Sequence, residues 1–196
     1  MATIEAQRKA ELRARFRAFR ASLSTEVHQA YSQLIVHHLM QLPELLQAQT
    51  VMLYWPLVDR REIDLRPLIF WLWERGVQVA LPVVVSTAAG TPQLEARRFQ
   101  TTAQLAAGPW GLQEPHNTLF VPPEALEVVI VPALGAGRNG YRLGYGKGYY
   151  DAFLRGLAAC TICPIYAACL VDYIPPEQHD IPMRILVTEH EILRLP

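Results

Sequence analysis

The feature that most constrains the fold is the alternation of short apolar runs with helical patterns along the chain. Polar residues rarely interrupt the apolar runs, which is typical of strands buried on both faces of a sheet. Strands that alternate with helices favour a parallel sheet, because each connection between parallel strands has to cross one face of the sheet. We therefore predict an α/β fold, a single-domain sandwich over residues 1–196 with a largely parallel central sheet flanked by helices.

The apolar runs, together with the glycines and prolines between them, place the individual elements. Strands are expected at residues 51–55, 77–85, 94–99, 127–132, 165–170 and 184–187. Asp64 is expected to cap a helix that Gly76 ends. Further helical segments are expected at residues 102–107 and 149–158.

The first forty residues are predicted to form two helices that flank the sheet. One face of the first helix carries regularly spaced apolar residues, namely Leu12, Phe16, Phe19 and Leu23. Ser24 can cap the second helix. Its apolar stripe consists of Val27, Ala30, Tyr31, Leu34, Ile35, His38, Leu39 and Leu42.

The composition excludes a disordered chain, because 51% of the 196 residues are apolar and only 18% are charged. Lys plus Arg and Asp plus Glu number 18 each, so net charge does not favour nucleic acid or a membrane surface as a partner. The apolar runs are also shorter than the roughly 20 residues that a membrane span needs. We expect a cytoplasmic monomer with neither nucleic-acid nor membrane partners.

The two ends of the chain carry opposite charges. Acidic residues gather near the end, at Asp172, Glu177, Asp180, Glu189 and Glu191. In the first helix Lys9 and Arg13 are four residues apart, so they share one face and could clamp a phosphate together. The alternative for this pair is a solvated basic face, and that interpretation is kept for the other basic residues, Arg8, Arg15, Arg17 and Arg20.

Three cysteines lie close together near the end of the chain. Their odd number and the lack of a signal-peptide pattern indicate a reducing compartment rather than a disulfide framework. Cys160 and Cys163 form a CxxC pair, but a tetrahedral metal site would need two more ligands, and only Cys169 and His179 are near in sequence. We interpret the cysteines as buried thiols around a core strand.

A glycine-rich connection precedes the helix expected at residue 149. Its glycines are Gly135, Gly137, Gly140, Gly144, Gly146 and Gly148. Glycine at this density lets several backbone N–H groups converge on one anion. Lys147 and Arg142 add positive charge, and the following helix N-terminus favours phosphate. Asp151 could cap that helix or hold a magnesium ion. The pattern predicts polyphosphate binding, with ATP and magnesium as the expected ligands.

The connection matches neither of the common nucleotide-binding motifs. It lacks GxxxxGK[ST], and its strand and helix are too far apart for a dinucleotide fingerprint. The alternative is a glycine-rich connection packed by Tyr145, Tyr149 and Tyr150.

Five segments together resemble the 5-formyltetrahydrofolate cyclo-ligase family, also called methenyltetrahydrofolate synthetases. They are KAELR at residues 9–13, EID at 62–64, WGLQEP at 110–115, RLGYGKGYYD at 142–151 and the closing run at 175–189. The resemblance implies closure of 5-formyltetrahydrofolate to 5,10-methenyltetrahydrofolate, with ATP consumed and ADP and phosphate released.

The resemblance also implies roles for individual residues. ATP would be contacted by Lys9, Arg13, Arg142, Gly144, Gly146, Lys147, Gly148, Tyr149 and Tyr150, with Arg142 and Lys147 acting in catalysis. The folate would be bound by Glu62, Trp110 and Tyr150, for which a surface acid and two core aromatics are the alternatives. Magnesium would be held by Asp151 and Asp180, although Asp180 also suits a turn.

The chain departs from the family pattern just before the glycine loop. Where the family usually has an aromatic residue and an acid, this chain has Ala136 and Gly137. This motivates a first alternative, a paralogue that binds nucleotide or folate without catalysis. A second alternative is a nucleic-acid-binding protein that uses the arginines of the first helix, which net charge zero and the lack of an RNA-binding motif disfavour.

Overall fold

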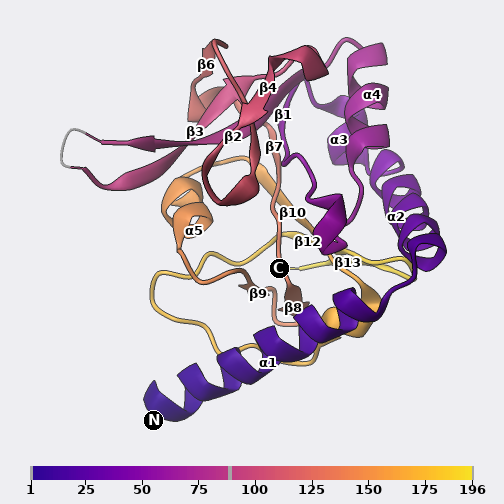
Figure 1. Cartoon of the computed structure of the whole chain (residues 1–196), viewed down its shortest axis with the longest axis vertical. Helices are drawn as coiled ribbons and strands as arrows, with labels where there is room; N and C mark the ends of the chain where they lie inside the picture. Colours follow the sequence, from indigo (N-terminus) through magenta and orange to yellow (C-terminus); the bar gives the residue numbers. More distant parts are fainter. Residues whose placement is uncertain (1, 88–89, 196) are drawn as a thin grey trace.

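The structure is a computed structural model that describes residues 2–87 and 90–195, apart from the side chains of residues 2, 3 and 110. An eight-stranded sheet runs through its centre in the order β13-β12-β10-β7-β1-β2-β3-β6 (Figure 1). The strands are β1 Thr50–Met52, β2 Gln78–Ser86, β3 Pro92–Arg98, β6 Phe120–Val121, β7 Val128–Ile130, β10 Cys160–Pro164, β12 Ile185–Val187 and β13 Ile192–Arg194.

The five central strands are parallel, as the uninterrupted apolar runs predicted. Parallel pairs join β12 to β10, β10 to β7, β7 to β1 and β1 to β2. The outer strands β13, β3 and β6 are antiparallel to their neighbours. The prediction of an α/β fold with a largely parallel sheet is therefore confirmed.

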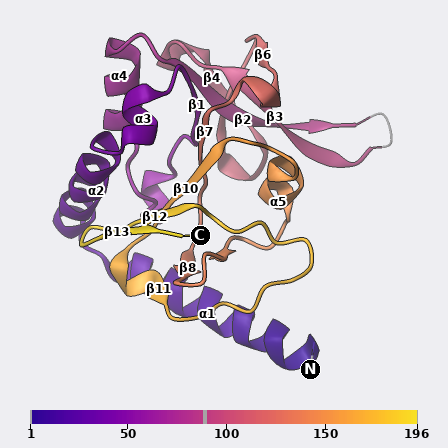
Figure 2. The same ribbon diagram turned by 180° about the vertical axis from the view of Figure 1, so that it is seen from behind.

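Helices cover the sheet and form two separate cores. They are α1 Ala2–Ser22, α2 Thr25–Met40, α3 Pro43–Gln47, α4 Arg66–Glu74 and α5 Tyr149–Leu154. Within β1, Val51 belongs to the core under α2 to α4, whereas Met52 belongs to the core that contains Leu154 of α5. Alternate residues of a strand point to opposite faces, so α5 lies on the other side of the sheet from α2 to α4 (Figure 2). None of the described helices is long and apolar enough to cross a membrane.

Two small sheets flank the main one. The first is β11 Leu170–Val171, β8 Gly135–Gly137 and β9 Arg142–Leu143, and the second pairs β4 Leu105–Ala107 with β5 Gln113–Pro115. Short 3-10 turns occupy Val58–Arg60, Thr102–Gln104, Pro109–Gly111, Pro123–Ala125 and Ala167–Cys169.

The prediction of a strand at residues 165–170 is wrong. The strand in this region is β10, Cys160–Pro164, which pairs with β7 and β12. Proline has no N–H to continue a ladder, so Pro164 suits the end of a strand. The chain then turns at Ala167–Cys169, where the Glu189 carboxylate accepts the Ala167 N–H at 2.8 Å.

Other boundaries also need correction. The segment 102–107 is helical only at Thr102–Gln104, because the next residues pair with β5. The helix expected at 149–158 ends at Leu154, shortly before Gly156, whose φ is +77°. Asp64 is not the capping residue of α4, a position held by Leu65, but its carboxylate still accepts the Arg66 N–H at 3.1 Å.

The buried face of α2 differs from the predicted stripe. Val27, Ala30 and Leu34 are exposed, and the buried residues are His28, Ser32, Ile35, Val36 and Leu39. The apolar pattern did not predict this face because His28 and Ser32 are polar. Both are buried, since they form hydrogen bonds with the backbone of Glu62 and Asp64. The three cysteines are free thiols, as predicted, and burial raises the pKa of Cys163 to about 12.

Candidate functional site

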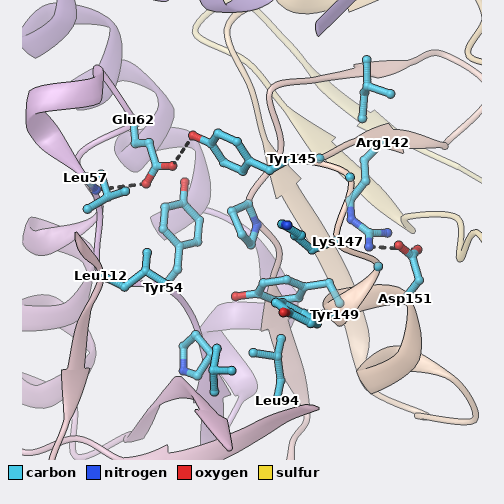
Figure 3. A pocket seen from close by; sticks show the side chains of 18 of the residues that line it. Tyr54, Leu57, Glu62, Leu94, Leu112, Arg142, Tyr145, Lys147, Tyr149 and Asp151 are labelled. Carbon is cyan, nitrogen blue, oxygen red and sulfur yellow. Dashed lines mark hydrogen bonds and ion pairs between the residues drawn. The ribbon is translucent and has the colours of Figure 1, made fainter. Parts of the chain in front are cut away.

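A cavity of about 520 Å³ opens at the carboxyl ends of the central strands (Figure 3). Tyr54 and Trp55 follow β1, Pro132 follows β7, and Pro82 and Val84 lie in the second half of β2. Ligands of open α/β sheets bind beyond this edge, because the loops that follow the strands surround it.

The cavity brings together the predicted site residues from distant parts of the sequence. Those whose side chains are described all line it: Lys9, Arg13, Glu62, Arg142, Gly144, Gly146, Lys147, Gly148, Tyr149, Tyr150, Asp151 and Asp180. The side chain of Trp110, which was predicted to face the folate, lies outside the described residues.

The glycine loop, residues 144–148, connects β9 to α5. Gly146 and Gly148 have φ values of +90° and +71°, in the left-handed region that favours glycine. A Cβ on Gly146 would lie 3.7 Å from the Arg13 guanidinium, so the loop passes directly beside α1. Lys147 is exposed and has no ion-pair or hydrogen-bond partner among the described residues. In Figure 3 its amino group points into the cavity.

Lys9 joins the two ends of the chain. Its ammonium donates to Glu177 Oε1 at 2.8 Å and to Asp180 Oδ2 at 3.0 Å, and its side chain is only 7% exposed. Burial would lower the pKa of Lys9, but the two carboxylates outweigh it and the pKa is raised. One turn along α1, Arg13 Nε donates to the carbonyl oxygen of Gly144 at 3.0 Å. The face shared by Lys9 and Arg13 therefore points into the cavity.

Arg142 and Asp151 form a second ion pair. Arg142 Nη2 lies 2.9 Å from Asp151 Oδ1, and both side chains are mostly buried. The same pair holds the backbone of Ile181, since Arg142 Nη1 donates to its carbonyl and Asp151 Oδ1 accepts its N–H. The segment that carries Asp180 is thereby fixed against α5.

Glu62 lies at the opposite end of the cavity from Asp151 (Figure 3). Its carboxylate accepts the Leu57 N–H at 3.0 Å through Oε2 and the Tyr145 hydroxyl at 2.9 Å through Oε1. His28 Nε2 donates to the Glu62 carbonyl at 2.7 Å, and Ser32 Oγ accepts the Asp64 N–H at 3.1 Å. These contacts from α2 hold the Glu62 backbone in place before any ligand binds.

Arg20 departs from the solvated basic face expected for it. It is 5% exposed and donates to the carbonyl oxygen of Ala133, ahead of the β8–β9 hairpin. Its guanidinium lies 5.9 Å from the Tyr166 ring centroid. The side chain is buried beside Phe16 and Leu23, the residues of this region that belong to the core.

Tyr149 and Tyr150 both line the cavity. The Tyr150 hydroxyl is buried and has no hydrogen-bond partner among the described residues. Burial raises the pKa of Tyr150, with the charge of Glu62 adding to the effect and that of Arg142 opposing it. A buried hydroxyl without a partner is costly, so a ligand acceptor that reaches Tyr150 would relieve that cost.

Several lining residues were not predicted as site residues, namely Tyr54, Arg60, Glu114, Tyr145, Glu177 and His179. Glu177 and Glu114 were visible as part of the acidic end and of the WGLQEP segment. Tyr145 was visible only as a packing residue. No pattern in the sequence marks Tyr54, which continues the apolar run of β1 and is 7% exposed.

Glu114 is a carboxylate on an otherwise apolar wall formed by Pro82, Val84, Leu94 and Leu112. Its Oε1 accepts the Val84 N–H at 3.2 Å. Burial raises the pKa of Glu114, and this hydrogen bond only partly offsets the effect. A raised pKa in the folded state means that stability is greatest when the carboxyl is protonated and falls as the pH rises through that pKa.

Glu114→Gln is therefore expected to raise the melting temperature at pH 7, because glutamine keeps an oxygen for the Val84 N–H but cannot ionise. The gain should shrink toward pH 4, near the ordinary pKa of a glutamate, where wild-type Glu114 is also neutral. Thermal melts of both proteins across this range measure it. A gain that is equal at both pH values would show that ionisation of Glu114 is not its cause.

Ala136 and Gly137 lie outside the cavity lining. Ala136 is fully buried and pairs with Arg142 of β9 and with Leu170 of β11. A Cβ on Gly137 would lie 2.2 Å from Asn139 Oδ1 and 2.7 Å from the Ile174 N. The space that a side chain at 137 would need is filled by Asn139, which bonds both the N–H and the carbonyl of Ile174.

Gly137→Asp, which introduces the acid usual in the resembling family, is expected to lower the free energy of unfolding by about 2–3 kcal/mol through overpacking. For a chain of this size the melting temperature should fall by roughly 5–10 °C. Gly144→Ala is the matched control for stability, since its added Cβ would meet no atom within 4 Å. Equal melting temperatures for Gly137→Asp and the wild type would contradict this packing.

Comparison with known proteins gives a consistent result. A family model described as the 5-formyltetrahydrofolate cyclo-ligase family matches residues 5–189. The 5-formyltetrahydrofolate cyclo-ligase of Escherichia coli (strain K12) is 31% identical over 178 residues, which cover 88% of this chain and 96% of that protein. The NMR structure of Aquifex aeolicus 5,10-methenyltetrahydrofolate synthetase is similar with a TM-score of 0.82 and 32% identity, covering 95% of this chain and 92% of that one. A Mycoplasma pneumoniae 5,10-methenyltetrahydrofolate synthetase, at 22% identity and a TM-score of 0.73, is similar in fold.

Proposed function

The chain belongs to the 5-formyltetrahydrofolate cyclo-ligase family and is a ligase, and from this premise we propose that it converts 5-formyltetrahydrofolate to 5,10-methenyltetrahydrofolate with consumption of ATP. The observation that carries the proposal is that one cavity joins the glycine loop to the buried carboxylate of Glu62, and that Lys147 in this loop has no ion-pair or hydrogen-bond partner among the described residues. One end of the cavity suits a polyphosphate and the other a flat ring with N–H donors.

The chemistry explains why such an enzyme needs ATP. The formyl group on N5 is an amide, so its carbon is a weak electrophile and its oxygen a poor leaving group. Transfer of the γ-phosphoryl group to the formyl oxygen corrects both, because the carbon becomes electrophilic and phosphate can leave. N10 then attacks that carbon, the C–O bond breaks, and N10 loses its proton to give the methenyl bridge. Positioning and charge neutralisation suffice for this sequence of steps.

The cations around the glycine loop suit the triphosphate. The Lys147 side chain lines the cavity where the γ-phosphate would lie, and Lys9 and Arg13 on α1 face the same space. The backbone N–H groups of Gly144, Gly146 and Gly148 lie in the part of the loop where phosphates would pass. Charge of this kind is most effective when it faces the negative charge that develops during transfer, which is the role we assign to Lys147 and Arg142.

Asp151 and Asp180 fit a magnesium ion that arrives with ATP. Each uses one carboxylate oxygen for a cation and a backbone N–H, which leaves Asp151 Oδ2 and Asp180 Oδ1 with no hydrogen bond among the described residues. His179 Nε2 lies 3.8 Å from Asp180 Oδ1. No cluster of three or more potential metal ligands occurs in the described part of the chain. Mg²⁺ commonly takes one or two carboxylates together with phosphates and water, and it would neutralise phosphate charge here.

Glu62 suits the pterin ring. A carboxylate can accept two N–H bonds from an amino-pyrimidinone, and Glu62 is held rigidly by its backbone contacts to α2. Tyr150, whose hydroxyl has no hydrogen-bond partner within the described part of the chain, also lines the cavity and could contact either substrate.

Incubation of the pure protein with 5-formyltetrahydrofolate, ATP and magnesium tests the proposal. We expect the methenyl absorbance to grow and to require both ATP and the metal. No growth at saturating substrate, with binding of either ligand retained, would favour the non-catalytic paralogue instead. The nucleic-acid alternative has its own test: Lys9, Arg13 and Arg20 of α1 face the cavity or the core, whereas Arg8, Arg15 and Arg17 are exposed. It predicts salt-dependent binding to generic RNA or DNA, and an absence of such binding at low salt would dispose of it.

A further inference from the structure

The Tyr145 hydroxyl is hydrogen-bonded to the carboxylate of Glu62, the group that is assigned to bind the pterin ring. It donates to Glu62 Oε1 at 2.9 Å, while Oε2 takes the Leu57 N–H. Glu62 is 6% exposed, so these two hydrogen bonds satisfy a buried charge when no ligand is bound. A pterin N–H that approaches Oε1 meets the Tyr145 hydroxyl already in place.

The rest of Tyr145 is loosely held. The residue is 43% exposed, and the Arg17 guanidinium lies 5.8 Å from its ring centroid. Tyr145 stands between Gly144 and Gly146 in the glycine loop, and glycine on both sides restricts the backbone less than any other residue would. The bond to Glu62 is therefore the main specific contact that ties this part of the loop to the folate end of the cavity.

The same loop carries the residue assigned to the γ-phosphate. Lys147 follows Tyr145 by two positions, and the carbonyl of Gly144 is held by Arg13 from the other side. A loop fastened to Glu62 through Tyr145 is not free to adjust around a triphosphate. Release of Tyr145 would free the loop and, with it, Lys147.

We propose that Tyr145 is a positioning residue that couples the folate and ATP ends of the cavity: its hydroxyl latches the glycine loop to Glu62 until a pterin N–H replaces it. The inference rests on the proposed function. Folate binding then requires the released loop, and ATP favours the same released loop. Two ligands that select one state bind cooperatively, and the factor by which each tightens the other is the same.

The size of the effect follows from the strength of the latch. A net hydrogen-bond contribution of about 1 kcal/mol corresponds to roughly a fivefold preference for the latched loop. A ligand that binds only the released loop has its apparent affinity reduced by about that factor. Removal of the Tyr145 hydroxyl should therefore raise the apparent affinity for such a ligand by the same factor.

Tyr145→Phe tests the latch. The dissociation constant of 5-formyltetrahydrofolate is measured by calorimetry, with and without a non-hydrolysable ATP analogue and magnesium, for the variant and the wild type. In the wild type we expect the analogue to tighten folate binding about fivefold. In Tyr145→Phe we expect folate alone to bind about fivefold more tightly than to the wild type, and the analogue to add no further tightening.

A matched control and a second ligand separate the outcomes. Tyr173→Phe removes a hydroxyl from another exposed tyrosine, outside the cavity, and should behave as the wild type. A folate analogue with a methyl group in place of the pterin 2-amino group should lose the advantage that Tyr145→Phe gives. Folate that binds to Tyr145→Phe with unchanged or weaker affinity would overturn the latch alone. A wild-type protein that binds no folate would overturn the proposed function as well.

Discussion

Lys147→Ala is expected to lower kcat/KM by about 100- to 1000-fold while leaving the fold intact. The loss is the size seen when one group that faces developing charge is removed from a site where phosphoryl transfer depends on electrostatics. The fold should not suffer, because Lys147 is exposed and makes no ion pair or hydrogen bond with the described residues. Steady-state kinetics of methenyl formation and a thermal melt of the same preparation measure both.

Arg155→Ala is the matched control for Lys147→Ala. Arg155 is an exposed cation just beyond the end of α5 and does not line the cavity. Its replacement should change neither kinetics nor melting temperature. Full activity in Lys147→Ala would mean that the glycine loop does not serve phosphoryl transfer. Lost activity together with a lowered melting temperature would point to misfolding. Such a result is not expected, because Lys147 has no partner among residues 2–87 and 90–195.

Glu62→Gln is expected to lower kcat/KM for 5-formyltetrahydrofolate by about 100-fold. Glutamine has nearly the same shape, but it presents one oxygen and one N–H₂ group where the pterin presents only donors. The loss of one hydrogen bond to a charged group, of about 2–3 kcal/mol, accounts for that factor. The KM for ATP should stay near the wild-type value, because Glu62 lies at the other end of the cavity from Asp151.

A loss confined to 5-formyltetrahydrofolate, with the KM for ATP unchanged, distinguishes a role of Glu62 in folate binding from a structural role. Glu124→Gln, at an exposed position outside the cavity, supplies the control. A Glu62→Gln variant that loses affinity for ATP and folate alike would indicate a general disturbance of the cavity. A variant with unchanged folate kinetics would remove Glu62 from the substrate site.

The sequence predicted the architecture where the patterns were long and local. The buried apolar runs of β1, β2, β7 and β12 were found, and so were the first two helices with Ser24 at the start of the second. The sequence did not predict strand β10 or the buried face of α2, and both errors have the same cause. A short apolar run does not show where its hydrogen-bond partners lie, and His28 and Ser32 are buried only because the backbone around Glu62 receives them.

The same division applies to the site. Residue types and spacing determined that Lys147 stands in a loop of glycines and that Lys9 and Arg13 share one helical face. They also showed that basic and acidic residues gather at opposite ends of the chain. Each of these is a property of a single segment, so the sequence alone shows it. Only the tertiary structure decided that Lys9 meets Glu177 and Asp180, and that Tyr145 reaches Glu62. Distances between segments depend on how helices and strands pack, and that packing is set by contacts across the whole core rather than by the spacing within any one element.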